Sequence, residues 1–190
     1  TLASFCHEGP WNLVTQRMWL LDLAANAVMP LVRQGEQDAI GHEFWTQNGM
    51  IFFDNRGPGH DGTITSDRTQ AVLTDVAVNQ NQMVPYVGLV DRNGELLRRL
   101  DMPYYCNHYH ANPDNTRLVG DDVDALVLID ISAAQAQATP DGPAIETLAH
   151  HGTSWRTQSS HCHPTWDWDG SRILYASDVD GKVNLYLMEL

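Results

Sequence analysis

A repeated pattern of strand and turn residues constrains the fold of this chain more than any other feature. Three segments, residues 42–53, 108–119 and 163–174, each combine a short strand-like run, a tight turn and a second apolar run. The turns are Asn-Gly, Asp-Asn and Asp-Gly, which favour hairpins because these residues tolerate positive φ angles. The repeat therefore predicts three similar β-hairpins.

Each hairpin is accompanied by a third strand and, in most cases, by a fourth. The third strands are strongly apolar runs at residues 16–23, 83–90, 124–131 and 184–190. Edge strands are expected after three of them, at residues 28–32, 95–100 and 145–150. The repeating unit is thus four short antiparallel strands, and such units in tandem are typical of β-propeller blades.

The ends of the chain set the predicted number of blades. Residues 1–6 look like the second strand of a blade, and the chain ends on a third strand. The prediction is an all-β fold with about three and a half blades, approximately residues 1–33, 40–101, 104–150 and 161–190. Closed propellers typically have about 4–8 blades. We therefore expect residues 1–190 to be the C-terminal part of one propeller domain, with the N-terminal half still to be added.

Two connections depart from the compact repeat. Residues 55–82 hold a Gly-Pro-Gly sequence and few apolar runs, and residues 133–143 are rich in Ala, Gln, Pro and Gly. Both are expected to be inserted loops, because their segments exceed the length of a compact blade of about 40–45 residues.

Charge and cysteine content limit the class of protein. The chain carries 11 Lys and Arg against 24 Asp and Glu, a net charge of −13. That balance argues against nucleic-acid binding and against attachment to anionic membranes by a basic patch. No apolar run is long enough to span a bilayer. Three cysteines are an odd number and do not indicate a disulfide scaffold, so we expect a reducing, cytoplasmic location, with the periplasm as the alternative.

Histidines recur at one position of the repeat. His42, His108 and His163 each lie six residues before the turn position of their hairpin. Equivalent residues on the first strands of successive blades lie at one height around the propeller axis. The register alone therefore directs three imidazoles toward one axial region.

A fourth histidine joins this set. His161 and His163 are two residues apart, and such residues share a face of an extended strand, so both could bind one ion. Gln158 lies three residues earlier and could add an amide oxygen. Imidazole with one amide oxygen suits Mn, Fe or Zn. The alternative for an isolated His-x-His pair is two ordinary imidazoles that are exposed or hydrogen-bonded.

Several motifs resemble the oligogalacturonate lyases, seven-bladed propeller enzymes of polysaccharide lyase family 22. They run in the family's order along almost the whole chain: Cys-His-Glu-Gly-Pro at 6–10, Gln-Arg-Met-Trp at 16–19, Gly-His-Glu-Phe-Trp at 41–45, His-Gly-Thr-Ser-Trp at 151–155 and Gln-Ser-Ser-His-Cys-His-Pro at 158–164. The resemblance covers roughly the second half of a family member.

The resemblance implies a role for each of six residues. The family's metal, usually Mn²⁺, would be held by four of them: His108, Gln158, His161 and His163. His42 would be the catalytic base and Arg17 the active-site arginine. For His42 the register alone would give a fourth imidazole ligand. We follow the resemblance, because a base must keep one nitrogen within reach of the substrate proton.

The implied reaction is metal-assisted β-elimination on short α-1,4-linked galacturonate oligomers from pectin, which gives 4,5-unsaturated products. Two other functions remain open from the sequence. One is a non-enzymatic TolB-like propeller that binds or scaffolds partners and would need no histidine cluster. The other is a metal-dependent hydrolase in which the same ligands activate water. Elimination differs from hydrolysis by its unsaturated product, which absorbs ultraviolet light.

Overall fold

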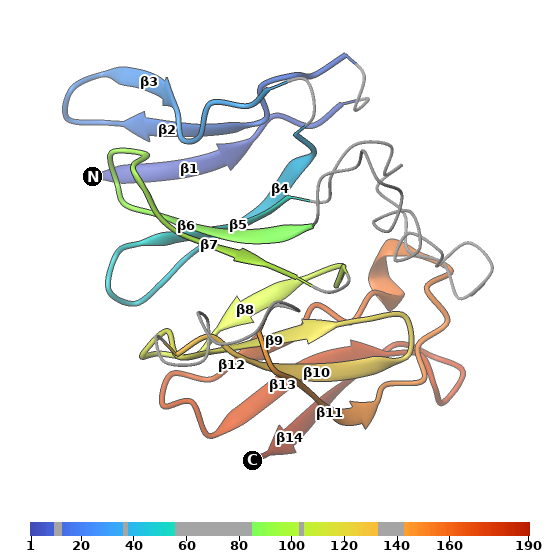
Figure 1. Ribbon diagram of the computed structural model, residues 1–190. Helices are drawn as coiled ribbons and strands as arrows, with labels where there is room; N and C mark the ends of the chain where they lie inside the picture. The colour runs from blue at the N-terminus through green and yellow to red at the C-terminus, as the bar shows by residue number, and fades with distance from the viewer. Residues whose placement is uncertain (10–12, 36–37, 56–84, 103–104, 133–142) are drawn as a thin grey trace, which may run out of the picture. The chain divides into compact units, whose positions relative to one another are not determined.

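The apolar runs of the repeat form strands, and the turns between them close antiparallel hairpins. The computed structural model describes residues 1–9, 13–35, 38–55, 85–102, 105–132 and 143–190 (Figure 1). The strands in these ranges are β1 (Leu2–Cys6), β2 (Met18–Asp22), β3 (Ala27–Pro30), β4 (Ile40–Trp45), β5 (Ile51–Asn55), β6 (Tyr86–Val90), β7 (Leu96–Asp101), β8 (Tyr109–Ala111), β9 (Arg117–Asp121), β10 (Ala125–Asp130), β11 (Ile145–His150), β12 (Thr165–Trp166), β13 (Arg172–Ser177) and β14 (Asn184–Glu189).

The strands assemble into four separate antiparallel sheets. Their orders are β1-β2-β3, β4-β5-β6-β7, β8-β9-β10-β11 and β12-β13-β14. Three, four, four and three strands are the numbers that the repeat predicts, and the sheet that lacks a first strand and the one that lacks a fourth stand where expected. The predicted all-β fold is confirmed. Within the described residues the single helical element is a short 3₁₀ helix, η1 (Gln158–Ser160).

The hairpin turns have the backbone conformation that their sequences favour. Gly49 has φ 79°, Asn115 has φ 58° and Gly170 has φ 75°. All three lie in the left-handed region, where glycine and asparagine are tolerated best. The short-range turn signals therefore identified the hairpins correctly.

The described residues divide into two compact units, which we treat separately. The N-terminal unit contains β1–β7 and the C-terminal unit contains β8–β14. In the N-terminal unit, β1 contacts β4, and the two sheets bury a shared apolar core. Its members are Met18, Leu20, Leu31, Ile40, Ile51, Phe53, Tyr86 and Val90. All residues of β5 and β6 are buried, as expected for the central strands of a sheet that is covered on both faces.

In the C-terminal unit, the first strands of the two sheets lie against each other. β8 and β12 are in contact, and the backbone N–H of Trp166 donates a hydrogen bond to Nδ1 of His110 at 3.1 Å. Trp166 also packs with Val119 and Ile173 in a small core between the sheets. Adjacent first strands are the arrangement that the propeller prediction requires.

Some expectations differ from the structure or lie beyond it. The first strands of the third and fourth sheets are short and begin after the repeated histidines: His108 precedes β8, and His163 lies outside β12. The expected insertion at 55–82 and the loop at 133–143 fall almost entirely outside the described residues. In the part of the chain that is described, no helix is long and apolar enough to cross a membrane.

Candidate functional site

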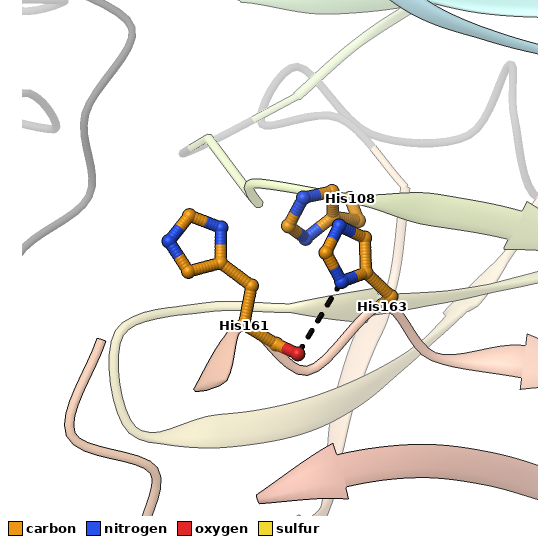
Figure 2. Close-up of side chains that lie close together, drawn as sticks. All are labelled: His108, His161 and His163. Carbon is orange, nitrogen blue, oxygen red and sulfur yellow. Dashed lines mark hydrogen bonds between the residues drawn. The ribbon is translucent and has the colours of Figure 1, made fainter. Parts of the chain in front are cut away.

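Three histidines of the C-terminal unit converge on one point. His108 lies just before β8, whereas His161 and His163 lie in the segment that joins η1 to β12. One ring nitrogen from each lies within 4.8 Å of the others, and Figure 2 shows the three rings grouped together. The ring centroid of His108 is 3.9 Å from that of His163 and 5.7 Å from that of His161. With metal–nitrogen bonds of about 2 Å, small ring rotations would bring all three onto one ion.

The cluster is graded in exposure. His108 is buried, His161 is half-buried and His163 is exposed. Nδ1 of His163 lies 3.3 Å from the carbonyl oxygen of His161, the contact drawn in Figure 2. A carbonyl only accepts, so this contact places the proton on Nδ1 of His163 and leaves Nε2 as the metal-binding nitrogen. The exposed side of the cluster is where a substrate group would approach.

Hydrogen bonds fix the ring of His108 on both sides. The Asp121 carboxylate, fully buried at the end of β9, accepts from Nδ1 of His108 at 2.8 Å and from its backbone N–H at 2.6 Å. On the other side of the ring, Nδ2 of Asn107 lies 3.3 Å from Nε2. The carboxylate requires a proton on Nδ1, and the amide donor faces a lone pair on Nε2. His108 is thus set as a neutral ring with Nε2 ready to bind a cation.

A buried aromatic wall supports the cluster. The indole of Trp155, whose backbone has φ 57°, donates from Nε1 to the carbonyl of Val123 at 2.8 Å. Its ring lies 5.1 Å from that of His161 and is nearly parallel to that of His108 at 6.5 Å. His151 meets the same indole edge-on at 5.6 Å. The segment 151–155 therefore limits how far the ligand rings can rotate.

His151 is a structural member of this wall. Its Nδ1 accepts from the backbone N–H of Thr153 and its Nε2 donates to the carbonyl of Asp122, each at 3.1 Å. Burial lowers the pKa of His151, so the ring is held neutral. Both nitrogens are used in holding the loop.

Gln158 stands at the start of η1, with an exposed side chain. Its backbone carbonyl accepts from the N–H of His161 at 3.3 Å, which closes the 3₁₀ turn directly before the ligand segment. This short helix was not predicted. The part of Gln158 as a fourth ligand stays a prediction.

The geometry that brings His161 and His163 together differs from the expected one. The segment was predicted as an extended strand with both rings on one face. Instead, His161 is the C-terminal cap of η1 in an extended conformation, and His163 is left-handed, with φ 43°. The expectation that Cys162 points away is confirmed: it is fully buried in a cluster with Tyr105, Leu126 and Trp155. Burial raises the pKa of its thiol, which remains protonated.

His42 lies in the N-terminal unit, on β4, at a β-bulge. The register of β4 against β5 shifts between Gly41 and Phe44, and His42 has φ 47°. Its Nδ1 lies 3.2 Å from Oδ2 of buried Asp54 on β5, and its side chain is 38% exposed. The carboxylate places the proton on Nδ1, so Nε2 carries the lone pair that a base needs.

Glu43 follows His42 in the same bulge. We expected it on the opposite face of a regular strand, but the bulge interrupts the alternation on which that expectation depends. Glu43 is half-buried, and desolvation raises the pKa of its carboxyl group.

Arg17 is also in the N-terminal unit, directly before β2. Its guanidinium is almost completely buried, donating from one nitrogen to Glu8 at 2.9 Å and from another to the carbonyl of Gly9 at 3.0 Å. The Glu8 side chain is largely exposed. The arginine is thus held in one orientation beside a carboxylate that solvent, or a substrate carboxylate, can displace.

The structure brings together three of the six predicted site residues, namely His108, His161 and His163, and places His42 and Arg17 in the other unit. Sequence reasoning missed the two aspartates behind the histidines. A signal for them exists: Asp54 follows His42 by 12 residues and Asp121 follows His108 by 13, and each ends an apolar second strand.

Comparison with known proteins places the chain among characterised sequences. A family model described as oligogalacturonate lyase matches residues 1–190. An oligogalacturonide lyase of Pectobacterium atrosepticum is 29% identical over 205 residues, covering 99% of this chain and 46% of that protein. An oligogalacturonate lyase of Dickeya dadantii is 28% identical over 203 residues, with the same coverages. The chain spans less than half the length of these curated relatives.

Solved structures agree with this placement. An oligogalacturonate lyase in complex with manganese has a TM-score of 0.70 and 25% identity, and the match covers 100% of this chain and 45% of that one. The oligogalacturonate lyase of Vibrio parahaemolyticus has a TM-score of 0.72 and 22% identity, over 99% of this chain and 45% of that one, which shows the shared fold. Because the family model matches every residue from 1 to 190, this chain belongs to the oligogalacturonate lyase family.

Proposed function

We propose that the protein containing this chain cleaves short galacturonate oligomers by β-elimination, with a divalent metal, most probably Mn²⁺, held by His108, His161 and His163. The observation that carries the proposal is the convergence of three imidazoles with ring nitrogens within 4.8 Å. Their membership of a lyase family, with one relative solved in complex with manganese, supports the choice of reaction and ion. Gln158 is proposed as the fourth ligand.

The donor set fits such an ion. Two of the three rings carry their proton on Nδ1, toward a carboxylate in His108 and toward a carbonyl in His163, and so present Nε2. Neutral imidazoles with an amide oxygen suit Mn, Fe or Zn. A bound ion would act as a Lewis acid on the uronate carboxylate and stabilise negative charge that develops beside it.

The chain's own residues would carry out the remaining steps. His42, with its Nδ1 proton toward Asp54, has Nε2 placed to take the proton from C5 of the uronate. The C5–H bond breaks, the electron pair forms the C4–C5 double bond, and the O4 leaving group departs. Arg17 would hold the substrate carboxylate in place of Glu8, because a guanidinium matches a carboxylate with two parallel hydrogen bonds.

We also propose that the four sheets are blades of one propeller of about seven, completed by an N-terminal half. The support is the strand count of three, four, four and three, together with the 46% coverage of the curated relatives. The substrate and activity belong to that whole protein.

The test is an assay of the intact protein with trigalacturonate. We expect ultraviolet absorbance from an unsaturated product to rise with Mn²⁺, to disappear after chelation and to return when Mn²⁺ is added back. New reducing ends without absorbance would indicate the hydrolase instead. Substrate binding with no cleavage under any metal would indicate a binding propeller.

A further inference from the structure

Two histidines in different units share one arrangement. In each case an aspartate near the end of the second strand of a sheet reaches Nδ1 of a histidine beside the first strand. Asp54 on β5 does this for His42, and Asp121 on β9 does it for His108. Both carboxylates are buried, with exposures of 2% and 0%.

We propose that Asp54 and Asp121 are matched positioning residues, each holding the Nδ1 proton of its histidine so that Nε2 faces outward. For His42 the presented Nε2 is the base, and for His108 it is the metal ligand. The proposal rests on the function proposed above for these two histidines.

The sheet register explains why the same residue type recurs. Asp121 lies opposite His108: its backbone N–H donates to the His108 carbonyl at 3.3 Å. Asp54 pairs with Gly41, one residue before His42, and the bulge that follows shifts the ring to the carboxylate. The chain therefore reaches the same contact by regular pairing in one unit and by a bulge in the other.

The chemistry of the contact gives it a function. An ionised carboxylate has no proton to donate, so a ring nitrogen bonded to it must carry the hydrogen. An imidazole can protonate on either nitrogen, and the wrong tautomer would present an N–H to the metal or to the substrate. A carboxylate behind a metal-bound histidine fixes both tautomer and ring orientation, and losing such a partner typically costs about 10–100-fold in metal affinity.

Asparagine is the sharpest replacement for either residue, because it keeps the shape and can reverse the hydrogen bond. In Asp121→Asn the amide oxygen can still accept the His108 backbone N–H, which turns the NH₂ group toward Nδ1. Nδ1 must then accept, and the proton moves to Nε2, where it blocks the metal. Asp54→Asn would likewise move the proton of His42 onto the nitrogen that must accept one.

The experiment compares the two variants in the intact protein, each serving as the control for the other. Asp121→Asn is expected to weaken Mn²⁺ binding, measured by calorimetry, by about 10–100-fold. Asp54→Asn should leave Mn²⁺ affinity within about twofold of wild type and lower kcat by about 10²-fold with little change in KM, since it acts on proton abstraction. A merely structural role would not separate the two readouts in this way.

Histidine variants separate failure of this inference from failure of the proposed function. If His108→Ala loses the metal but Asp121→Asn binds it normally, or if His42→Ala loses turnover but Asp54→Asn keeps it, the positioning role is wrong while the proposed function stands. If neither histidine variant has an effect, both proposals are overturned.

A measurement on the wild-type protein keeps the inference testable should an asparagine variant fail to fold. Nitrogen-15 NMR of histidine-labelled, metal-free protein reports which ring nitrogen carries the proton. We expect His42 and His108 both to be protonated on Nδ1 alone. A proton on Nε2 in the neutral ring of either residue would overturn the proposal.

Discussion

The two histidine–aspartate pairs differ in their surroundings rather than in their own contacts. His42 is 38% exposed on a bulged edge strand, whereas His108 is buried beside the rings of His161 and His163. Among the described residues, those three histidines form the one group of three or more His, Cys, Asp or Glu side chains whose ligand atoms converge. A backing carboxylate prepares a ring nitrogen, and the neighbours determine whether that nitrogen meets a metal or a substrate proton.

The largest effect is expected from breaking the convergent group. His161→Ala removes one of three imidazole ligands, so metal occupancy should fall sharply, and activity with it by about 10⁴-fold or more at low Mn²⁺, because a Lewis acid contributes several kcal/mol to such a step. Metal analysis beside the absorbance assay checks this. His150→Ala is the matched control, since that histidine is exposed at the end of β11. Full metal content in His161→Ala would remove it from the ligand set.

The next effect comes from the histidine that stands apart from that group. His42→Ala should leave metal content unchanged and lower kcat by about 10²–10⁴-fold, the usual contribution of a general base. The same two measurements apply. Loss of the metal would make His42 a ligand, as the repeat register alone suggested, and full activity would place the base elsewhere.

How much of this comparison the sequence could predict depends on whether the signal is local. The strands and hairpins follow from apolar runs and turn dipeptides, whose preferences act over a few residues. The repeat register also predicted that His108 and His163 would meet. It could not predict the bulge at His42 or the left-handed backbone of His163, because tertiary contacts impose both. The carboxylate partners were missed because their contacts depend on the pairing of strands, which only the folded sheet reveals.

A smaller effect is expected from altering the other active-site candidate of the N-terminal unit. Arg17→Lys keeps the charge but loses the fork that contacts both Glu8 and the carbonyl of Gly9. One charge-assisted hydrogen bond is worth about 1.5–3 kcal/mol, so kcat/KM should fall by about 10–100-fold. Arg172→Lys is the control, because Arg172 pairs with Asp167 on the surface. Equal, negligible effects of both variants would show that Arg17 does not bind substrate.

The smallest effect concerns stability and acid. Burial lowers the pKa of His151, so as pH falls below about 6.5 the unfolded chain takes up a proton before the folded one does. The free energy of unfolding should therefore decrease between pH 7.5 and pH 5.5, measured by urea denaturation. His151→Gln, which cannot titrate, should show a shallower decrease. An unchanged slope would mean that other groups cause the acid sensitivity.

The central claim is that one unit of this chain holds the metal and that His42 does not bind it. The most direct test is anomalous diffraction from crystals of the intact protein grown with Mn²⁺. The account predicts one strong peak bonded to His108, His161 and His163 at about 2.0–2.3 Å, with Gln158 as the amide ligand and His42 outside bonding distance. A peak that bonds His42, or one centred away from the three histidines, would contradict it.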